Sequence, residues 1–319
     1  MKKVFISIAV LNLILINNCT SIVESNDQVQ NPPINILWSK TGLDSSWIYS
    51  MIFMDNGVFF AGTNYGLLFS TDNGTTWTKS NQNLFKTVTS FYKYSDGRIL
   101  AGTPGNGLFL SSDNGVNWSN LGLKNINITS VAVSNSGKIF VGTRGDGIFV
   151  SDGLNQNWRQ ANNDFQVQTF PSLFVTNKNI IFAGGTGVYR SIDDSKTWSL
   201  KNNGLGNWSV YSLISNKSGN ICAGTDVGGF FLSTNNGESW SKLNHNLTNT
   251  EITSLAINDV GHIFAGTWKG GVYRTTNNGL NWEAVDSLLT EKQVSKIIIS
   301  KDQYIYAGTN RGIFKAATK

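Results

Sequence analysis

Residues Gly261–Trp282, GHIFAGTWKGGVYRTTNNGLNW, decide the fold of this chain. The stretch reads as a strand, a tight turn, a second strand, another tight turn, and a tryptophan that opens a third strand. Near-copies recur along the sequence. The glycine of the AGT-like triplet returns every 40 or 42 residues, at Gly62, Gly102, Gly142, Gly184, Gly224, Gly266 and Gly308. A tryptophan follows six of these glycines, at Trp77, Trp118, Trp158, Trp198, Trp240 and Trp282, whereas Trp38 precedes the first glycine.

A repeat of this length that consists of short strands is typical of the blade of a β-propeller. No segment shows the 3.6-residue periodicity that a helical repeat requires. We therefore predict an all-β fold, a single seven-bladed β-propeller with four antiparallel strands in each blade. In the quoted repeat, the strands are expected at 252–258, 262–267, 271–276 and 282–285.

The two ends of the repeat region complement each other. Ile34–Lys40 carries Trp38 but follows no turn, while residues 296–318 supply three strands and stop before a tryptophan. We expect Ile34–Lys40 to be the outer strand of the last blade, so that residues 34–319 close into a ring. Closure removes the free sheet edges of an open array.

The N-terminal segment predicts export. Lys2 and Lys3 precede an apolar run, Val4–Ile16, that is too short to cross a bilayer, so residues 1–19 read as a signal peptide. The polar residues 20–33 are expected to form a flexible tether. The sequence thus indicates a protein of the bacterial cell envelope or a secreted protein.

Cys19 at the end of this segment resembles the lipidated cysteine of bacterial lipoproteins. Asn18 is larger than the residue usually found before that cysteine, so secretion without a lipid anchor remains the alternative. Any membrane association is expected only through this anchor. The other cysteine, Cys222, replaces Phe of the IFAGT strands and is expected to be a buried thiol.

Composition excludes several classes of function. Charged residues make up 14% of the chain, against about 25% in a typical soluble domain, and its formal net charge is +5. Lys and Arg form no cluster, so we expect no nucleic-acid partner. No phosphate loop, nucleotide motif or close group of His, Cys and carboxylates occurs, so we expect neither a cofactor nor a metal. We expect a monomer.

A turn with a recurring sequence precedes each of the six tryptophans. The clearest copies are STDNGTTW (Ser70–Trp77) and SSDNGVNW (Ser111–Trp118). They match S-x-D-x-G-x-x-W, and here the chain resembles the Asp-box, or BNR, repeat proteins. That group includes sialidases, propellers of xyloglucan-cleaving glycosidases, sortilin-type receptors and photosystem II assembly factors. The resemblance covers nearly the whole chain from Ile34, and it implies a fold more specifically than an activity.

These six segments, called the tryptophan turns below, need no catalytic explanation. Asp accepts hydrogen bonds from nearby amides, Gly takes a positive φ, and Trp buries its ring. The structural residues are Asp72, Gly74, Trp77, Asp113, Gly115, Trp118, Trp158, Asp193, Trp198, Asn235, Gly237, Trp240, Asn277, Gly279 and Trp282. Ser151–Trp158 lacks the Asp and Ser191–Trp198 has Ser195 in place of Gly, so we expect these two turns to be the loosest.

A serine recurs in the inner strands. It stands at Ser50, Ser90, Ser130, Ser172, Ser212, Ser254 and Ser295. We interpret it as a small, hydrogen-bonding residue where seven strands crowd the axis.

The resemblance implies that a ligand would bind on the rim formed by the loops between second and third strands and the loops between blades. We call this the inter-blade rim; the tryptophan turns lie on the opposite rim. Short loops contribute Tyr65, Asn106, Arg144, Asp146, Asp226, Trp268, Lys269 and Arg311, and longer loops contribute Trp47, Phe85, Phe165, Trp208, His245 and Glu251. Trp268, in a Gly-flanked loop beside Lys269, would suit stacking on a sugar or gripping a peptide, but a ring packed on the adjacent loop is an equal alternative.

Glycoside hydrolysis would require two facing carboxylates. Asp146 and Asp226 are the acids of the short rim loops, although both stand in ordinary turn contexts. We therefore expect a non-catalytic binding or assembly module for a protein or glycan. A glycoside hydrolase of the xyloglucanase-like or sialidase-like type is the alternative, and assistance to the assembly of a membrane complex is a third possibility.

Overall fold

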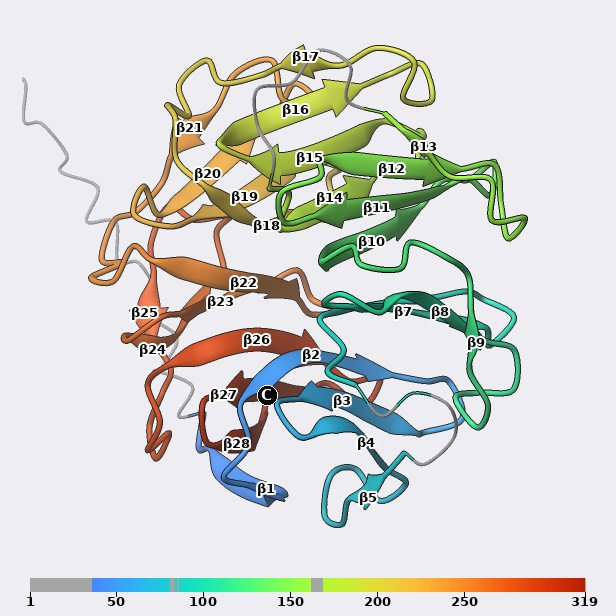
Figure 1. Cartoon of the computed structure of the whole chain (residues 1–319). Helices are drawn as coiled ribbons and strands as arrows, with labels where there is room; N and C mark the ends of the chain where they lie inside the picture. The colour runs from blue at the N-terminus through green and yellow to red at the C-terminus, as the bar shows by residue number, and fades with distance from the viewer. Residues whose placement is uncertain (1–35, 81–83, 85, 162–168, 319) are drawn as a thin grey trace, which may run out of the picture. The chain divides into compact units, whose positions relative to one another are not determined.

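The computed structural model describes residues 36–80, 84, 86–161 and 169–318. These residues form seven four-stranded antiparallel sheets arranged in a ring, a seven-bladed β-propeller (Figure 1). Following the colours of Figure 1, the chain passes once around the ring, and blue β1 lies beside dark red β28. No helix long and apolar enough to cross a membrane occurs in this part of the chain.

Each blade runs from an inner strand next to the axis to an outer strand. The inner strands are β2 (Ile48–Phe53), β6 (Ser90–Lys93), β10 (Ile128–Val133), β14 (Ser172–Val175), β18 (Val210–Ser215), β22 (Ile252–Ile257) and β26 (Val294–Ile299). The second strands are β3 (Phe59–Thr63), β7 (Ile99–Thr103), β11 (Ile139–Thr143), β15 (Ile181–Gly185), β19 (Ile221–Thr225), β23 (Ile263–Thr267) and β27 (Tyr304–Thr309).

The third and outer strands complete the blades. The third strands are β4 (Gly66–Ser70), β8 (Gly107–Ser111), β12 (Ile148–Ser151), β16 (Gly187–Ser191), β20 (Phe230–Ser233), β24 (Gly271–Thr275) and β28 (Gly312–Ala317). The outer strands are β5 (Thr78–Lys79), β9 (Ser119–Asn120), β13 (Arg159–Gln160), β17 (Ser199–Leu200), β21 (Ser241–Lys242), β25 (Glu283–Ala284) and β1 (Ser39–Asp44).

The AGT-like strands lie buried between neighbouring blades. All five residues of β3 are buried, and the same holds for its counterparts β7, β11, β15, β19 and β23. A Cβ placed on Gly62 would stand 2.0 Å from the carbonyl oxygen of Val88, in the next blade. The glycine is therefore needed because another backbone approaches it, as the sequence indicates.

The closing strand has the expected partner but different bounds. β1 pairs with β28, with Ser39 opposite Lys315. The described strand covers Ser39–Asp44, whereas the predicted strand is Ile34–Lys40, of which residues 34 and 35 lie outside the described residues. Trp38 is only 3% exposed, and its Nε1 donates to the carbonyl oxygen of Val285 at 2.6 Å. Its backbone amide donates to the carbonyl oxygen of Ser287, which follows the outer strand of blade six. Trp38 therefore belongs to the core between blades six and seven, and strand β1 begins at the next residue.

Most tryptophan turns follow the expected pattern. In the first, Asp72 Oδ1 accepts from the amide of Thr76 at 2.8 Å, and the amide of Gly74, at φ 89°, donates to Ser70 Oγ. Ser191–Trp198 keeps the same bonds, because Ser195 takes φ 68° and its amide reaches Ser191 Oγ at 2.9 Å. This bonding does not agree with a loose turn.

Ser151–Trp158 departs from the pattern, as its sequence indicates. Ser151 Oγ donates to Asn155 Oδ1 at 2.9 Å and also contacts the carbonyl oxygen of Gly153. Asn155 thus replaces the missing Asp as the local acceptor, from a different position in the turn.

Candidate functional site

Repeated backbone hydrogen bonds organise the inter-blade rim. In each case, the turn between second and third strands donates to a residue just before the inner strand. The amide of Arg144 donates to Asn127 at 2.8 Å, and the amide of Trp268 donates to Glu251 at 3.0 Å. These bonds hold side chains from both kinds of loop on one rim.

The inner strands begin with an irregularity that turns side chains toward the axis. The register of β2 against β3 shifts between Ile48 and Ser50, and β10, β18, β22 and β26 show the same shift. A β-bulge of this kind redirects the extra residue. The residues at this position, next to the rim, are called the upper tier: Tyr49, Thr89, Thr129, Pro171, Tyr211, Thr253 and Ser295.

The next residue of each inner strand forms a lower tier. Each of these residues pairs with the glycine of its AGT-like strand, as Ser50 does with Gly62. The members are Ser50, Ser90, Ser130, Ser172, Ser212, Ser254 and Lys296. The prediction that Ser295 is the seventh serine is therefore wrong by one position, because Lys296, not Ser295, pairs with Gly308.

Three adjoining cavities lie along the axis and at this rim. The mouth cavity, of about 480 Å³, is lined by the whole upper tier together with Trp47, Arg144, Glu251, Trp268 and Lys296. The axial cavity, of about 200 Å³, is lined by lower-tier residues that include Lys296. A side cavity of about 730 Å³ extends over blades three and four. Thr129, Pro171 and Tyr211 line all three, so the cavities adjoin one another.

Aromatic rings from blades six and one meet at the mouth cavity. The ring centroids of Trp47 and Trp268 are 5.8 Å apart, and those of Trp47 and Tyr49 are 6.3 Å apart. The amide of Trp47 donates to Asn64 Oδ1 at 2.9 Å, which fixes the backbone at the start of blade one. Trp268 therefore packs on the ring of Trp47, which precedes blade one, and it also lines the mouth cavity.

Charged groups surround the same cavities. Burial raises the pKa of Tyr211, and the carboxylates of Asp226 and Glu251 add to that rise while Arg144 opposes it. Burial alone lowers the pKa of Lys296. Within the described residues, neither Lys296 nor Glu251 forms an ion pair.

The structure brings together only part of the predicted rim set. Trp47, Arg144, Glu251 and Trp268 share the mouth cavity. The remaining described residues lie outside the three cavities: Tyr65, Asn106, Asp146, Trp208, Asp226, His245, Lys269 and Arg311. Phe85 and Phe165 lie outside the described residues.

Local contacts account for several of the residues outside the cavities. Arg311 Nη1 lies 3.6 Å from Glu291 Oε1. Asn106 Nδ2 donates to the carbonyl oxygen of Pro104. The ring of Trp208 covers Gly228, where a Cβ would meet it at 2.5 Å.

The two candidate catalytic acids do not form a pair in the cavities. Asp226 Oδ1 accepts from the amides of Ser209 at 3.1 Å and Val227 at 2.9 Å, which is a structural role in its turn. The backbone amide of Asp146 donates to Thr143 Oγ1 within the β11–β12 turn. Among the described residues, Glu251 is the single carboxylate that lines the mouth, axial or side cavity.

Sequence reasoning missed Tyr49, Tyr211 and Lys296. Each lies within an inner strand, where the repeat pattern indicates packing instead of binding. A position-by-position alignment of the seven inner strands would have found them, because tyrosine replaces threonine twice in the upper tier and lysine replaces serine once in the lower tier.

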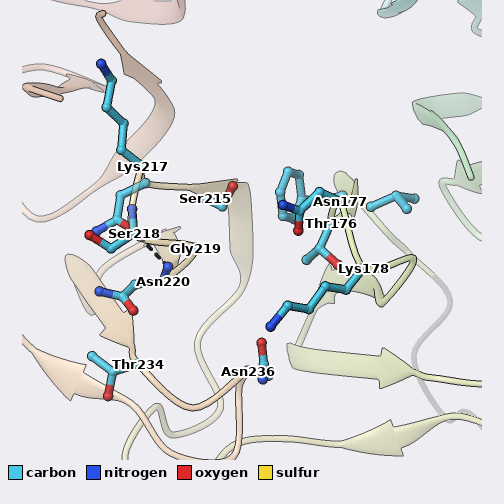
Figure 2. Close-up of a pocket in the computed structure, with 13 residues that line it drawn as sticks. Thr176, Asn177, Lys178, Ser215, Lys217, Ser218, Gly219, Asn220, Thr234 and Asn236 are labelled. Carbon is cyan, nitrogen blue, oxygen red and sulfur yellow. Dashed lines mark hydrogen bonds between the residues drawn. The ribbon is translucent and has the colours of Figure 1, made fainter. Parts of the chain in front are cut away.

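The opposite rim carries a separate cavity of about 460 Å³ between blades four and five (Figure 2). It is lined by the hairpin turns around Lys178 and Lys217 and by the tryptophan turn at Asn236. In Figure 2, the amine of Lys178 points toward Asn236, whereas that of Lys217 points away. Asn216 Oδ1 accepts hydrogen bonds from two backbone amides of its own turn. This side-chain oxygen therefore stabilises the turn. We therefore favour the inter-blade rim as the site.

The free cysteine and the possible metal ligands of the described residues do not suggest a further reactive site. Cys222 is buried, and burial raises the pKa of its thiol to about 12. No group of three His, Cys, Asp or Glu side chains is placed to hold a metal ion in the described part of the chain.

No protein-family model and no curated protein matches this sequence. Several solved structures are similar. The extracellular domain of BT4673 from B. thetaiotaomicron is 18% identical, with a TM-score of 0.73, over 89% of this chain and 40% of that chain. This chain therefore spans about two fifths of the BT4673 chain.

Two further structures show the same architecture. YCF48 bound to D1 peptide is 15% identical, with a TM-score of 0.70, over 89% of this chain and 97% of that chain. The GH74 enzyme of Niastella koreensis is 14% identical, with a TM-score of 0.63, over 86% of this chain and 43% of that chain. At these identities, the similarity establishes the β-propeller fold that this chain shares with them.

Proposed function

We propose that this chain is a non-catalytic binding or assembly module that recognises a protein or a glycan in the mouth cavity. The observation that carries the proposal is the cavity itself, of about 480 Å³, which Trp47, Tyr49, Trp268 and Arg144 line. Tryptophan, tyrosine and arginine are the residues that most often dominate binding energy, and aromatic faces also stack on sugars.

We further propose that the protein is exported and anchored through a lipid on Cys19. The pattern of residues 1–19 supports export. Similarity to an extracellular domain agrees with it. Such a location would present the inter-blade rim to ligands outside the cytoplasm.

Alanine variants of Trp47 and Trp268 test the binding site. Tyr65→Ala is the matched control, because Tyr65 is a 60% exposed aromatic residue of the same rim that lines none of the three cavities. Arrays of glycans and peptides would identify a ligand, and titration calorimetry would compare the variants. We expect Trp268→Ala to weaken binding about 10- to 100-fold and Tyr65→Ala to leave it unchanged. Equal affinity in all three variants and the wild type would contradict the proposed site.

A glycoside hydrolase remains testable with the same protein. Turnover of any glycan that is lost in Asp146→Asn, Asp226→Asn or Glu251→Gln would overturn the non-catalytic proposal. We expect no turnover, because a glycosidase needs two carboxyl groups flanking the scissile bond and only Glu251 lines the three cavities among the described residues.

A further inference from the structure

Lys296 occupies a place in the ring that six other blades give to serine. It pairs with Gly308 as Ser254 pairs with Gly266. The exchange is therefore a substitution at one fixed position of the repeat, at the junction of the mouth and axial cavities.

Several serines of the lower tier link neighbouring inner strands. The oxygens of Ser172, Ser212 and Ser254 accept from the amides of Leu213, Leu255 and Ile297, at 3.0 to 3.1 Å. An ammonium group has no lone pair and cannot accept such a bond. Lysine therefore gives up the structural role of serine at the junction of blades seven and one.

The ammonium also lacks an internal counter-charge. Its side chain is half-buried in the channel, and no ion pair or hydrogen bond to it occurs within the described residues. Burial is the single cause of the lowered pKa of this amine. Partial burial removes part of the hydration of this unpaired charge, which costs free energy. A bound anion would offset this cost.

The surrounding hydroxyl groups narrow the class of ligand. Thr129 Oγ1 donates to Phe170 at 2.7 Å, Thr253 Oγ1 donates to Val294 at 2.6 Å, and Ser295 Oγ donates to Ile48 at 2.5 Å. With these protons engaged by backbone carbonyls, Lys296 is the strongest donor at the base of the mouth cavity. One cation in about 200 Å³ suits a small group of single negative charge.

We propose that the junction of the mouth and axial cavities is a subsite for a carboxylate group, which the Lys296 ammonium binds while the body of the ligand contacts Trp47 and Trp268. The inference rests on the proposed function and specifies its ligand: an end group with one carboxylate, carried either by a peptide chain end or by a sugar acid. Arg144 and Glu251 stand nearer the rim and would contact the body of the ligand.

Two pairs of small probes distinguish the two possible sources of the carboxylate, a peptide chain end and a sugar acid. N-acetylglycine is compared with its amide, and glucuronate is compared with glucose, by titration followed by NMR on the wild type. Lys296→Ser is the test variant, because serine fits this position in six blades. Lys124→Ser is the control, because Lys124 is an exposed lysine in a loop of the same rim and lines none of the three cavities. The thermal midpoint of each protein is recorded with and without probe.

We expect one carboxylate probe to bind about 10- to 100-fold more tightly than its neutral partner. Lys296→Ser should abolish this difference, whereas Lys124→Ser should retain it. Without ligand, Lys296→Ser should have a thermal midpoint equal to or above that of the wild type. Equal binding of charged and neutral probes, or the same binding by inorganic phosphate, would overturn the carboxylate subsite.

The two proposals fail separately. If Trp268→Ala abolishes binding of an array ligand and Lys296→Ser does not affect it, the mouth cavity remains the site and the carboxylate subsite is wrong. A carboxylate effect that survives in Lys296→Ser would likewise overturn the subsite.

Discussion

Trp118 joins two blades through its ring. The side chain is 3% exposed, and the ring meets Phe60 of blade one edge-on at 6.4 Å. Its Nε1 donates to the carbonyl oxygen of Gly115 at 3.1 Å. We expect Trp118→Ala to lower the free energy of unfolding by about 3 to 5 kcal/mol, because it leaves a cavity between the sheets. Denaturant melts measure this loss, and an unchanged midpoint would refute the core role of the ring.

Asp72 shows how a single carboxylate couples its turn to pH. Hydrogen bonds from the side chain and then the amide of Thr76, with one from Ser70, lower the pKa of Asp72 to about 2. A lowered pKa means that the carboxylate stabilises the fold fully above its unfolded pKa of about 3.8, and that this stability is lost as pH falls toward 2.

Asp72→Asn tests this coupling with a residue that the chain itself uses. Asn235 Oδ1 already accepts the amide of Ser239 at 3.0 Å in the equivalent turn. We expect the wild type to melt slightly above Asp72→Asn at pH 6 and equally near pH 2. Asn235→Asp should be more stable than the wild type only above about pH 4, where the new carboxylate is ionised. A difference between wild type and Asp72→Asn that does not change with pH would contradict the role of the charge.

Strand β1 decides whether the ring is closed. It covers the edge of β28, and Trp38 just before it lies in the core between blades six and seven. Deletion of residues 1–44 would expose that edge and remove the ring of Trp38. We expect the shortened protein to associate and to lose its cooperative thermal transition, because a free edge pairs with other chains. Light scattering and calorimetry measure both effects, and deletion of residues 1–33 is the control.

A monomeric shortened protein with the same thermal midpoint as the control would show that β1 is dispensable. Adding residues 34–44 as a separate peptide should restore the midpoint if pairing with β28 is the cause. The measured affinity of that peptide would give the strength of closure directly.

The fold could be predicted from the sequence because each blade repeats the same local choices. The AGT-like glycine recurs seven times and the tryptophan turn six times, and each of these local sequences favours one local structure. The start of β1 could not be predicted, because Trp38 bonds to Val285 in a part of the chain remote in sequence.

The candidate site was predicted less completely for a related reason. The loop residues Trp47 and Trp268 stand out because they place large aromatic rings in otherwise polar turns, and Arg144 stands out as a charged residue in a short rim loop. Tyr49, Tyr211 and Lys296 belong to strands, and a bulge in the register turns the upper-tier side chains inward. Their exposure to a channel depends on seven strands converging, which no single repeat encodes.

The pairing of β1 with β28 also governs when folding can finish. Ser39 Oγ donates to the carbonyl oxygen of Lys315, a partner 276 positions away. During synthesis, blades one to six can form in order, but the seventh waits for the last residues to emerge. If the chain is exported, β1 therefore stays unpaired until residues 312–317 have also been translocated, and the ring closes only after that.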